Sequence, residues 1–221
     1  MRVRSRAGEG RVASRAAVIQ KAGSSVCEDE RMASAQTLSD ADRRILARWA
    51  IACAERVLPL FDADPSAVFD IADAVARAKA YSVGESSAAA EIRKRLIAGR
   101  AAKAATTPAG AAAARAVGQA AAVAHMGAHA LGAAGYAVKA ISLAHPDRPE
   151  IVSKEVSWQV DALSDDERSA LRLLPPLGES GAGPLGDGLL SRGVVGETIR
   201  VIQAQVGTTS SSTVSNDEEH R

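Results

Sequence analysis

Aromatic residues and cysteines are both scarce in this 221-residue sequence. It has two each of Phe, Tyr and Trp, so its core must be built mainly from Ala, Leu, Val and Ile, and few flat side chains are left for bases to stack on. Of the two cysteines, Cys27 lies in a polar leader and Cys53 on an apolar helical stripe. We therefore expect no disulfide between them, as suits a protein of the reducing cytoplasm.

The sequence also lacks a strong net charge and an uninterrupted apolar run. Its formal charge is +1, so no electrostatic argument favours nucleic acid or anionic lipid as a partner. Charged and polar residues, such as Arg115 and Gln119, interrupt the longest candidate for a membrane span. Residues 1–31 lack the apolar core of a secretion signal. We expect a cytoplasmic protein that binds neither nucleic acid nor membranes.

Alanine, the best intrinsic helix former, is abundant instead. The longest helix signal covers residues 108–144, where Thr107 is a suitable N-cap and Pro108 suits the first helical position. We expect one central helix of roughly 54 Å here, unless the glycine pair Gly132 and Gly135 kinks it. Its narrow stripe of small side chains predicts close packing against other helices and makes a homodimer a further expectation.

Capping signals and apolar periodicity predict further helices on both sides of this segment. The expected helices cover residues 39–61, 65–82, a stretch from Ser86 or Ser87 past Ala101, 150–162, 165–174 and 194–206. The third has the most basic outer face of the chain, with Arg93, Lys94, Arg95, Arg100 and Lys103. We interpret that face as solvated, since no interleaved aromatics or nucleic-acid motif accompany it.

Residues 175–190 are too rich in glycine and proline for a helix or strand. Their leucines predict an ordered loop that packs on the domain. The expected fold is thus all-α: an alanine-rich multi-helix bundle around a long central helix, with a Gly/Pro-rich loop and short helices at the C-terminus.

We expect three regions along the chain. Residues 1–34 are predicted to be a disordered arm or an upstream extension preceding a true start at Met32, with an organelle-targeting peptide as the third alternative. Residues 35–206 form a single helical domain, and residues 207–221 a disordered polar tail.

Three groups of residues invite a chemical interpretation. His125 and His129 are four residues apart, the spacing at which one helix face presents two imidazoles to a metal, but no third ligand is apparent. Hydrogen-bonding histidines in the bundle are the favoured reading, so we predict no metal or cofactor. Cys53, between two alanines, is expected in the core and not as a nucleophile. The glycines at 181–188 lack the lysine and hydroxyl of a phosphate loop.

Three segments together resemble bacterial immunity proteins with the immunity-five-like domain. They are residues 38–61 (LSDADRRILARWAIACAERVLPLF), residues 112–140 (AAARAVGQAAAVAHMGAHALGAAGYAVKA), and Glu155 followed by Trp158-Gln159. The resemblance spans about residues 38–162. It rests most on Trp49, Cys53, Glu55, His125, His129, Tyr136, Lys139 and Trp158-Gln159, in this order. The C-terminal loop has no counterpart in it.

The resemblance implies an all-helical cytoplasmic protein that binds and neutralises a toxin from a competing cell, as a stoichiometric inhibitor and not an enzyme. No catalytic residues come with it. The candidate partner-binding residues are polar positions that the bundle does not need: Arg48, Glu55, His125, His129, Tyr136, Lys139 and Trp158. Two alternatives stay open. Arg48, Glu55 and Lys139 could form ion pairs between helices, and the chain could be a helical binding or regulatory module for another protein or a small molecule.

Overall fold

Helices account for all the regular secondary structure that the computed structural model describes, which covers residues 34–207. The α-helices are α2 (Asp40–Val57), α3 (Pro65–Ser82), α4 (Ala88–Lys94), α5 (Ile97–Ala101), α6 (Pro108–Ala122), α7 (His129–Ala144), α8 (Pro149–Asp161), α9 (Asp165–Arg172) and α10 (Gly193–Gly207). Short 3-10 turns occur at Leu58–Leu60, Ala102–Ala104 and Leu189–Ser191. No β-strand occurs within 34–207, and the predicted all-α class is confirmed.

The predicted helix starts are confirmed because they depend on local hydrogen bonds. The side chains of Ser39, Asp64 and Thr107 each accept a bond from a backbone N–H in the first turn of the helix that follows. Ser164 and Glu167 form a full capping box at the start of α9.

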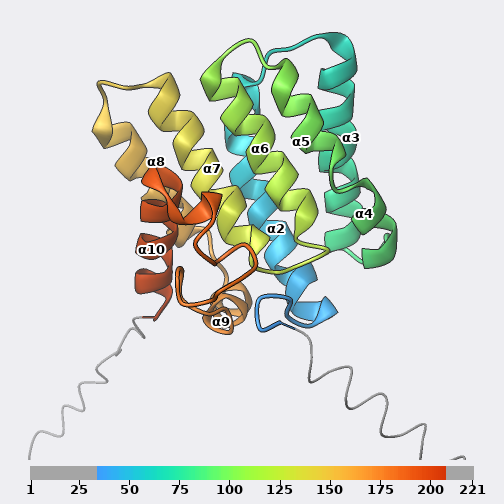
Figure 1. Cartoon of the computed structure of the whole chain (residues 1–221), viewed down its shortest axis with the longest axis vertical. Coiled ribbons are helices and arrows are strands. Elements are labelled where there is room, and N and C mark those ends of the chain that lie inside the picture. The colour runs from blue at the N-terminus through green and yellow to red at the C-terminus, as the bar shows by residue number, and fades with distance from the viewer. Residues whose placement is uncertain (1–33, 208–221) are drawn as a thin grey trace, which may run out of the picture. The chain divides into compact units, whose positions relative to one another are not determined.

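The prediction of one continuous central helix over residues 108–144 is wrong. A turn at residues 123–128 divides it into α6 and α7, which pack against each other and against α2 at the centre of the bundle (Figure 1). The turn is held by the chain before α2, where Gly127 N–H donates to the Thr37 carbonyl at 3.0 Å and Ala128 N–H to the Gln36 carbonyl at 3.1 Å. Leu38 packs on Gly127, whose missing Cβ leaves room for it.

The glycines of α7 do not kink it; they allow close packing instead. A Cβ on Gly135 would lie 2.8 Å from the Val195 side chain and 3.1 Å from its carbonyl, so α10 approaches α7 at this point. The predicted third helix is also divided, at Arg95 and Leu96, into α4 and α5.

Alanine fills most of the interior, as small side chains between closely packed helices require. Most alanines of α2, α6 and α7 are buried, and a few large side chains, including Leu46, Trp49 and Leu131, are buried with them. Trp49 donates its indole N–H to the Gln159 carbonyl at 2.8 Å, which joins α2 to α8.

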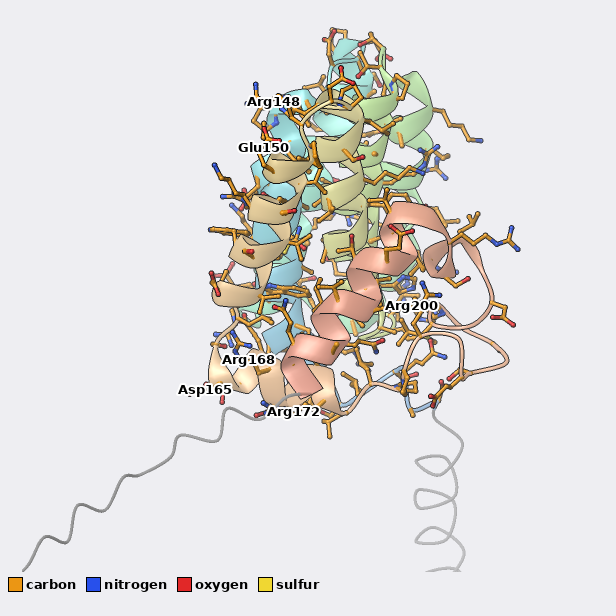
Figure 2. All side chains as sticks on the ribbon, turned by 90° about the vertical axis from the view of Figure 1, so that its left-hand side faces the viewer. Arg148, Glu150, Asp165, Arg168, Arg172 and Arg200 are labelled. Atoms are coloured by element: carbon orange, nitrogen blue, oxygen red, sulfur yellow. The ribbon has the colours of Figure 1, made fainter. Side chains whose placement is uncertain are left out.

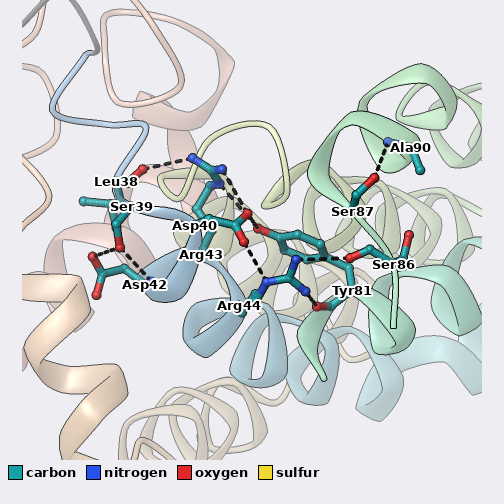
Figure 3. A network of polar contacts seen from close by, with 10 residues as sticks. All are labelled: Leu38, Ser39, Asp40, Asp42, Arg43, Arg44, Tyr81, Ser86, Ser87 and Ala90. Carbon is teal, nitrogen blue, oxygen red and sulfur yellow. Dashed lines mark hydrogen bonds and ion pairs between the residues drawn. The ribbon is translucent and has the colours of Figure 1, made fainter. Parts of the chain in front are cut away.

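Polar contacts fasten the start of α2 to the end of α3 (Figure 3). Arg44 donates to the carboxylate of Asp40 and to the backbone carbonyls of Tyr81 and Ser86, and its guanidinium lies over the Tyr81 ring at 4.5 Å. The Tyr81 hydroxyl donates to Asp40 at 3.0 Å. Burial alone would raise the pKa of Asp40, but the hydrogen bonds from Arg44 and Tyr81 lower it below its ordinary value.

The C-terminal loop lies across the ends of α6 and α7 that meet at the 123–128 turn (Figure 1). The amide of Gln36 holds it, donating to the Ala182 carbonyl at 2.7 Å and accepting from Leu185 N–H at 2.9 Å. Leu177, Leu185 and Leu190 are buried as predicted. Leu189, expected as an anchor, is exposed instead, because the 3-10 turn that begins there buries Leu190.

The last helix completes the core along α7. Figure 2 shows α10 running beside α8, with Arg172 of α9 near its end. Arg172 donates to the Val206 carbonyl at 2.9 Å, and Ile199 and Ile202 are fully buried. This segment is therefore an integral layer of the bundle.

Part of the expected domain organisation lies outside the described residues. Of the predicted extension (1–34) and tail (207–221), the structure describes only Ser34 and Gly207, and Cys27 also falls outside. From Ala35 onward the described chain belongs to one compact unit. None of the helices between Ser34 and Gly207 combines the length and apolar character that crossing a membrane needs.

Candidate functional site

A groove opens where α5, α6, the 123–128 turn, α7 and the C-terminal loop converge. It consists of two adjoining hollows of about 340 and 420 Å³. Both are lined by the same five side chains: Gln119, His125, His129, Tyr136 and Leu189. We call this feature the histidine groove. Three of the seven sequence-predicted site residues, His125, His129 and Tyr136, meet in it.

The floor of the groove, formed by Gln119 and His129, is polar. His129 begins α7, and its Nδ1 lies 2.8 Å from Oε1 of Gln119 on α6. Because an amide oxygen can only accept, Nδ1 carries the hydrogen and Nε2 is left as an acceptor. Gln119 fits because position 132 is glycine: a Cβ there would overlap the Gln119 amide oxygen.

His129 is held in its neutral form. Burial, and secondarily the neighbouring imidazole of His125, lower the pKa of His129 from 6.5 to about 4. The two ring centroids are 6.4 Å apart, and the His125 side chain is exposed. At neutral pH the His129–Gln119 pair therefore offers neutral hydrogen-bonding groups and no charge.

The prediction that the two histidines share one helix face is wrong. His125 lies in the turn before α7, where Val123 begins the departure from helix α6, and only His129 is helical. The turn nevertheless brings the rings together. In the part of the chain the structure describes, no cluster of three or more His, Cys, Asp or Glu residues could hold a metal ion.

The rim of the groove combines cations with exposed apolar side chains. Arg95 and Leu96 come from the α4–α5 junction, Arg115 from α6 and Leu189 from the C-terminal loop. Leu96 is 61% exposed and Leu189 is 78% exposed, which is unusual for leucine. The sequence did not predict these rim residues as binding residues: its pattern predicts Arg95 on a solvated basic face and Leu189 as an anchor of the loop. The available signal was that Arg115 and Gln119 interrupt an otherwise small and apolar helix.

The other four predicted residues lie apart from the floor of the groove. Glu55 of α2 pairs with Lys79 of α3 at 2.7 Å, an ion pair between helices as the alternative expected, although with a different partner. Arg48 is exposed and forms no ion pair within residues 34–207. Lys139 lies over the Tyr136 ring at 6.0 Å, the outer limit of a cation–π contact.

Trp158 belongs to a structural contact between α2 and α8. Arg56 stacks on its ring at 3.8 Å and forms an ion pair with the buried Glu155 at 2.9 Å. The Gln159 amide donates to Glu155 and to the Ala134 carbonyl of α7. These bonds attach α8 to the bundle, so they account for Trp158 without a partner.

Cys53 is fully buried, and burial raises the pKa of its thiol well above the ordinary value, with Glu155 adding to the effect. A buried thiol that stays protonated is a poor nucleophile. This setting agrees with the prediction of a core cysteine.

Comparison with protein families adds a second line of argument to this geometry. Residues 36–166, more than half of the chain, match the family described as Imm-5 like putative immunity protein. The chain belongs to this family. No curated protein and no solved structure matches it. The matched segment contains the whole floor of the groove and both of its arginines, whereas Leu189 and the rest of the loop wall come from residues beyond it.

Proposed function

We propose that this protein is a cytoplasmic immunity protein that binds a cognate protein toxin in a stoichiometric complex and so neutralises it. It acts by occupying a surface of the toxin and not as an enzyme. The histidine groove is its binding site, with His125, His129 and Tyr136 as contact residues. Neither nucleic acid nor a membrane takes part.

The observation that carries this proposal is that the family-matched segment builds a groove the fold does not need. The polar side chains of α2, α3 and α8 tie helices together, as with Arg56 and Glu155. In the groove, His125 is exposed and Leu96 and Leu189 expose apolar surface. Exposed apolar side chains around a polar hollow are typical of protein-binding surfaces.

The direct test is protection of cells. Each protein encoded beside this chain is expressed from an inducible promoter, with and without the chain, and survival is measured. We expect one of them to be toxic alone, harmless with the chain, and to co-purify with it in a complex of fixed stoichiometry. A well-expressed, folded chain that restrains none of the toxic neighbours would contradict the proposal. The same purification gives the mass of the free chain, which tests the expected homodimer.

A small-molecule binding module is the second candidate. Its support is the size of the hollows, since about 340 and 420 Å³ fall within the roughly 300–1,000 Å³ range of small-ligand sites. Native mass spectrometry of the protein purified from its own cells distinguishes the two. A retained small molecule that is lost in His129→Asn would favour the module.

A further inference from the structure

The basic residues of the described chain differ in whether they pair with a carboxylate. The arginines paired with carboxylates are Arg43, Arg44 and Arg56 of α2, Arg77 of α3 and Arg148 before α8. Unpaired exposed cations occur singly elsewhere in residues 34–207, as at Arg48 and Lys154, and are most numerous from α4 to α6. The exposed cations from α4 to α6 form no ion pair within residues 34–207. These unpaired cations are Arg93, Lys94, Arg95, Arg100, Lys103 and Arg115.

Two of them, Arg95 and Arg115, line the histidine groove. No Asp or Glu lines either hollow; Glu179 and Asp187, the acidic residues of the adjoining loop, lie outside both linings. The His129–Gln119 pair adds no charge, because the His129 imidazole is neutral at neutral pH. The groove therefore presents positive charge from its rim with no opposing carboxylate.

Apolar surface lies at the same rim. Leu96 adjoins Arg95 in sequence, and Leu189 faces the groove from the C-terminal loop. Both are more than half exposed, so covering them would release water from apolar surface. The ligand that fits this rim has negative charge and apolar side chains together.

We propose that the histidine groove binds an acidic segment of the protein partner, with carboxylates on Arg95 and Arg115 and an apolar side chain over Leu96 and Leu189. The inference rests on the proposed function and specifies the partner's chemistry. Leu189 lies beyond the family-matched residues 36–166, so the C-terminal loop supplies this part of the proposed contact.

A peptide fits the groove better than a nucleic acid does. Single strands bind through aromatic side chains on which bases stack. In the groove the phenol ring of Tyr136 is buried, and the imidazole of His125 is the exposed ring among the lining residues. Guanidinium groups bind carboxylates in a planar, two-bond geometry, and the exposed leucines have no role in holding a phosphate backbone. The binding experiment described next distinguishes an acidic peptide from a nucleic acid.

The test measures fluorescence anisotropy of the full chain with labelled probes. The probes are a peptide of alternating Glu and Leu, a matched peptide of alternating Lys and Leu, and a single-stranded oligouridine. We expect the Glu-Leu peptide to bind most tightly and to lose affinity as salt is raised. The double variant Arg95→Glu/Arg115→Glu should weaken its binding by about tenfold or more. Leu189→Ala should weaken it less.

The matched control is Arg148→Glu/Lys154→Glu, which makes the same charge change with exposed residues before and on α8. We expect binding within about twofold of the unmodified chain, since long-range charge effects are screened. Equal losses in the two double variants would contradict a specific site. Tighter binding of oligouridine than of the Glu-Leu peptide would overturn the peptide in favour of nucleic acid.

The outcome is separable from the fate of the proposed function. If the chain protects cells from a toxin and Arg95→Glu/Arg115→Glu protects equally well, the acidic-segment inference fails and the immunity function stands. If the Glu-Leu peptide binds as expected and no neighbouring toxin is neutralised, the groove chemistry stands and the immunity function fails. Thermal unfolding of each variant verifies that it is folded.

Discussion

The charged residues of α2, α3 and α8 differ from those of the groove rim in what they contact. Arg44 and Arg77 reach across to neighbouring elements and are largely buried, and Arg56 stacks on Trp158 while pairing with Glu155. The Arg95 side chain bonds to the carbonyl of Ile92 in the adjoining helix α4, and the Arg115 side chain makes no hydrogen bond or ion pair within residues 34–207. The first group holds helices together, and the second is available to a partner.

The physical basis of this difference is desolvation. A buried charge requires a partner, because an uncompensated charge in the interior costs several kcal/mol. An exposed arginine is solvated by water and gains about 1 kcal/mol or less from an ion pair. Unpaired cations at the rim therefore cost the fold nothing. Stability and binding should respond to opposite sets of substitutions.

The largest effect on stability is expected at Arg77. Its guanidinium forms an ion pair with Glu91 at 2.8 Å, and both side chains are largely buried, 11% and 4% exposed. Arg77→Met leaves Glu91 with only the Ser86 hydroxyl as a donor. We expect a loss of about 3–5 kcal/mol in the free energy of unfolding, measured with urea.

The matched control for this variant is Arg115→Met at the groove rim. It should change the free energy of unfolding by about 0.5 kcal/mol or less, as is usual for exposed sites. A loss at Arg115 as large as that at Arg77 would show that the rim arginines also serve the fold.

The second effect depends on pH and concerns His129. Its pKa is about 4 in the folded state and about 6.5 in an unfolded chain. The unfolded state therefore takes up the proton first as pH falls. Stability is complete above pH 6.5 and declines as pH falls towards 4, by roughly 3 kcal/mol at most.

His129→Asn keeps a side-chain donor near Gln119 and removes this titration. Comparing the free energy of unfolding of the unmodified chain and the variant across pH 7 to 4 cancels the contribution of the carboxylates. The variant should lose less stability as pH falls. His125→Asn, which changes an exposed ring, should leave most of the decline in place, and parallel curves for His129→Asn and the unmodified chain would contradict a neutral buried imidazole.

The third comparison uses two glycines, Gly135 in the packed core and Gly118 at the histidine groove. Gly135 faces α10, and a Cβ there would press on the Val195 side chain and backbone, so Gly135→Ala should cost about 1–3 kcal/mol. Gly118 lines the groove, where a Cβ would make ordinary contacts at 3.5 Å or more. Gly118→Ala should be neutral or stabilise by up to about 1 kcal/mol. Thermal unfolding measures the stability of both variants. Equal losses would contradict the looser packing around Gly118.

The smallest effect is expected at Glu55. Its ion pair with Lys79 joins α2 to α3, but the two side chains are 40% and 55% exposed. Glu55→Ala should cost less than about 1 kcal/mol, with the loss shrinking as salt is added. The double-mutant cycle with Lys79→Ala measures the pair itself. A coupling as large as that at Arg77 would remove the distinction between exposed and buried pairs.

Helix starts could be predicted because they are local. Ser39, Asp64, Thr107 and Ser164 each bond to backbone a few residues away, and the sequence alone contains that information. The end of α6 could not be predicted. It depends on Gln36 and Thr37, some ninety residues earlier, which bond to the backbone of the 123–128 turn.

The groove was predictable only in part, for the same reason. His125, His129 and Tyr136 stood out as polar residues in an alanine-rich segment. Gln119 as their partner, and Leu189 as the opposite wall, follow from contacts between α6, α7 and the loop that no local spacing encodes. Glu55 and Trp158 stood out equally, and the structure places them in contacts between helices.

The most direct test of the account is survival of cells expressing the cognate toxin with one of two charge-reversed chains. Arg95→Glu/Arg115→Glu should fold normally and fail to protect, whereas Arg148→Glu/Lys154→Glu should protect as well as the unmodified chain. Full protection by the first variant at equal expression would contradict the claim that the histidine groove is where this protein meets its partner.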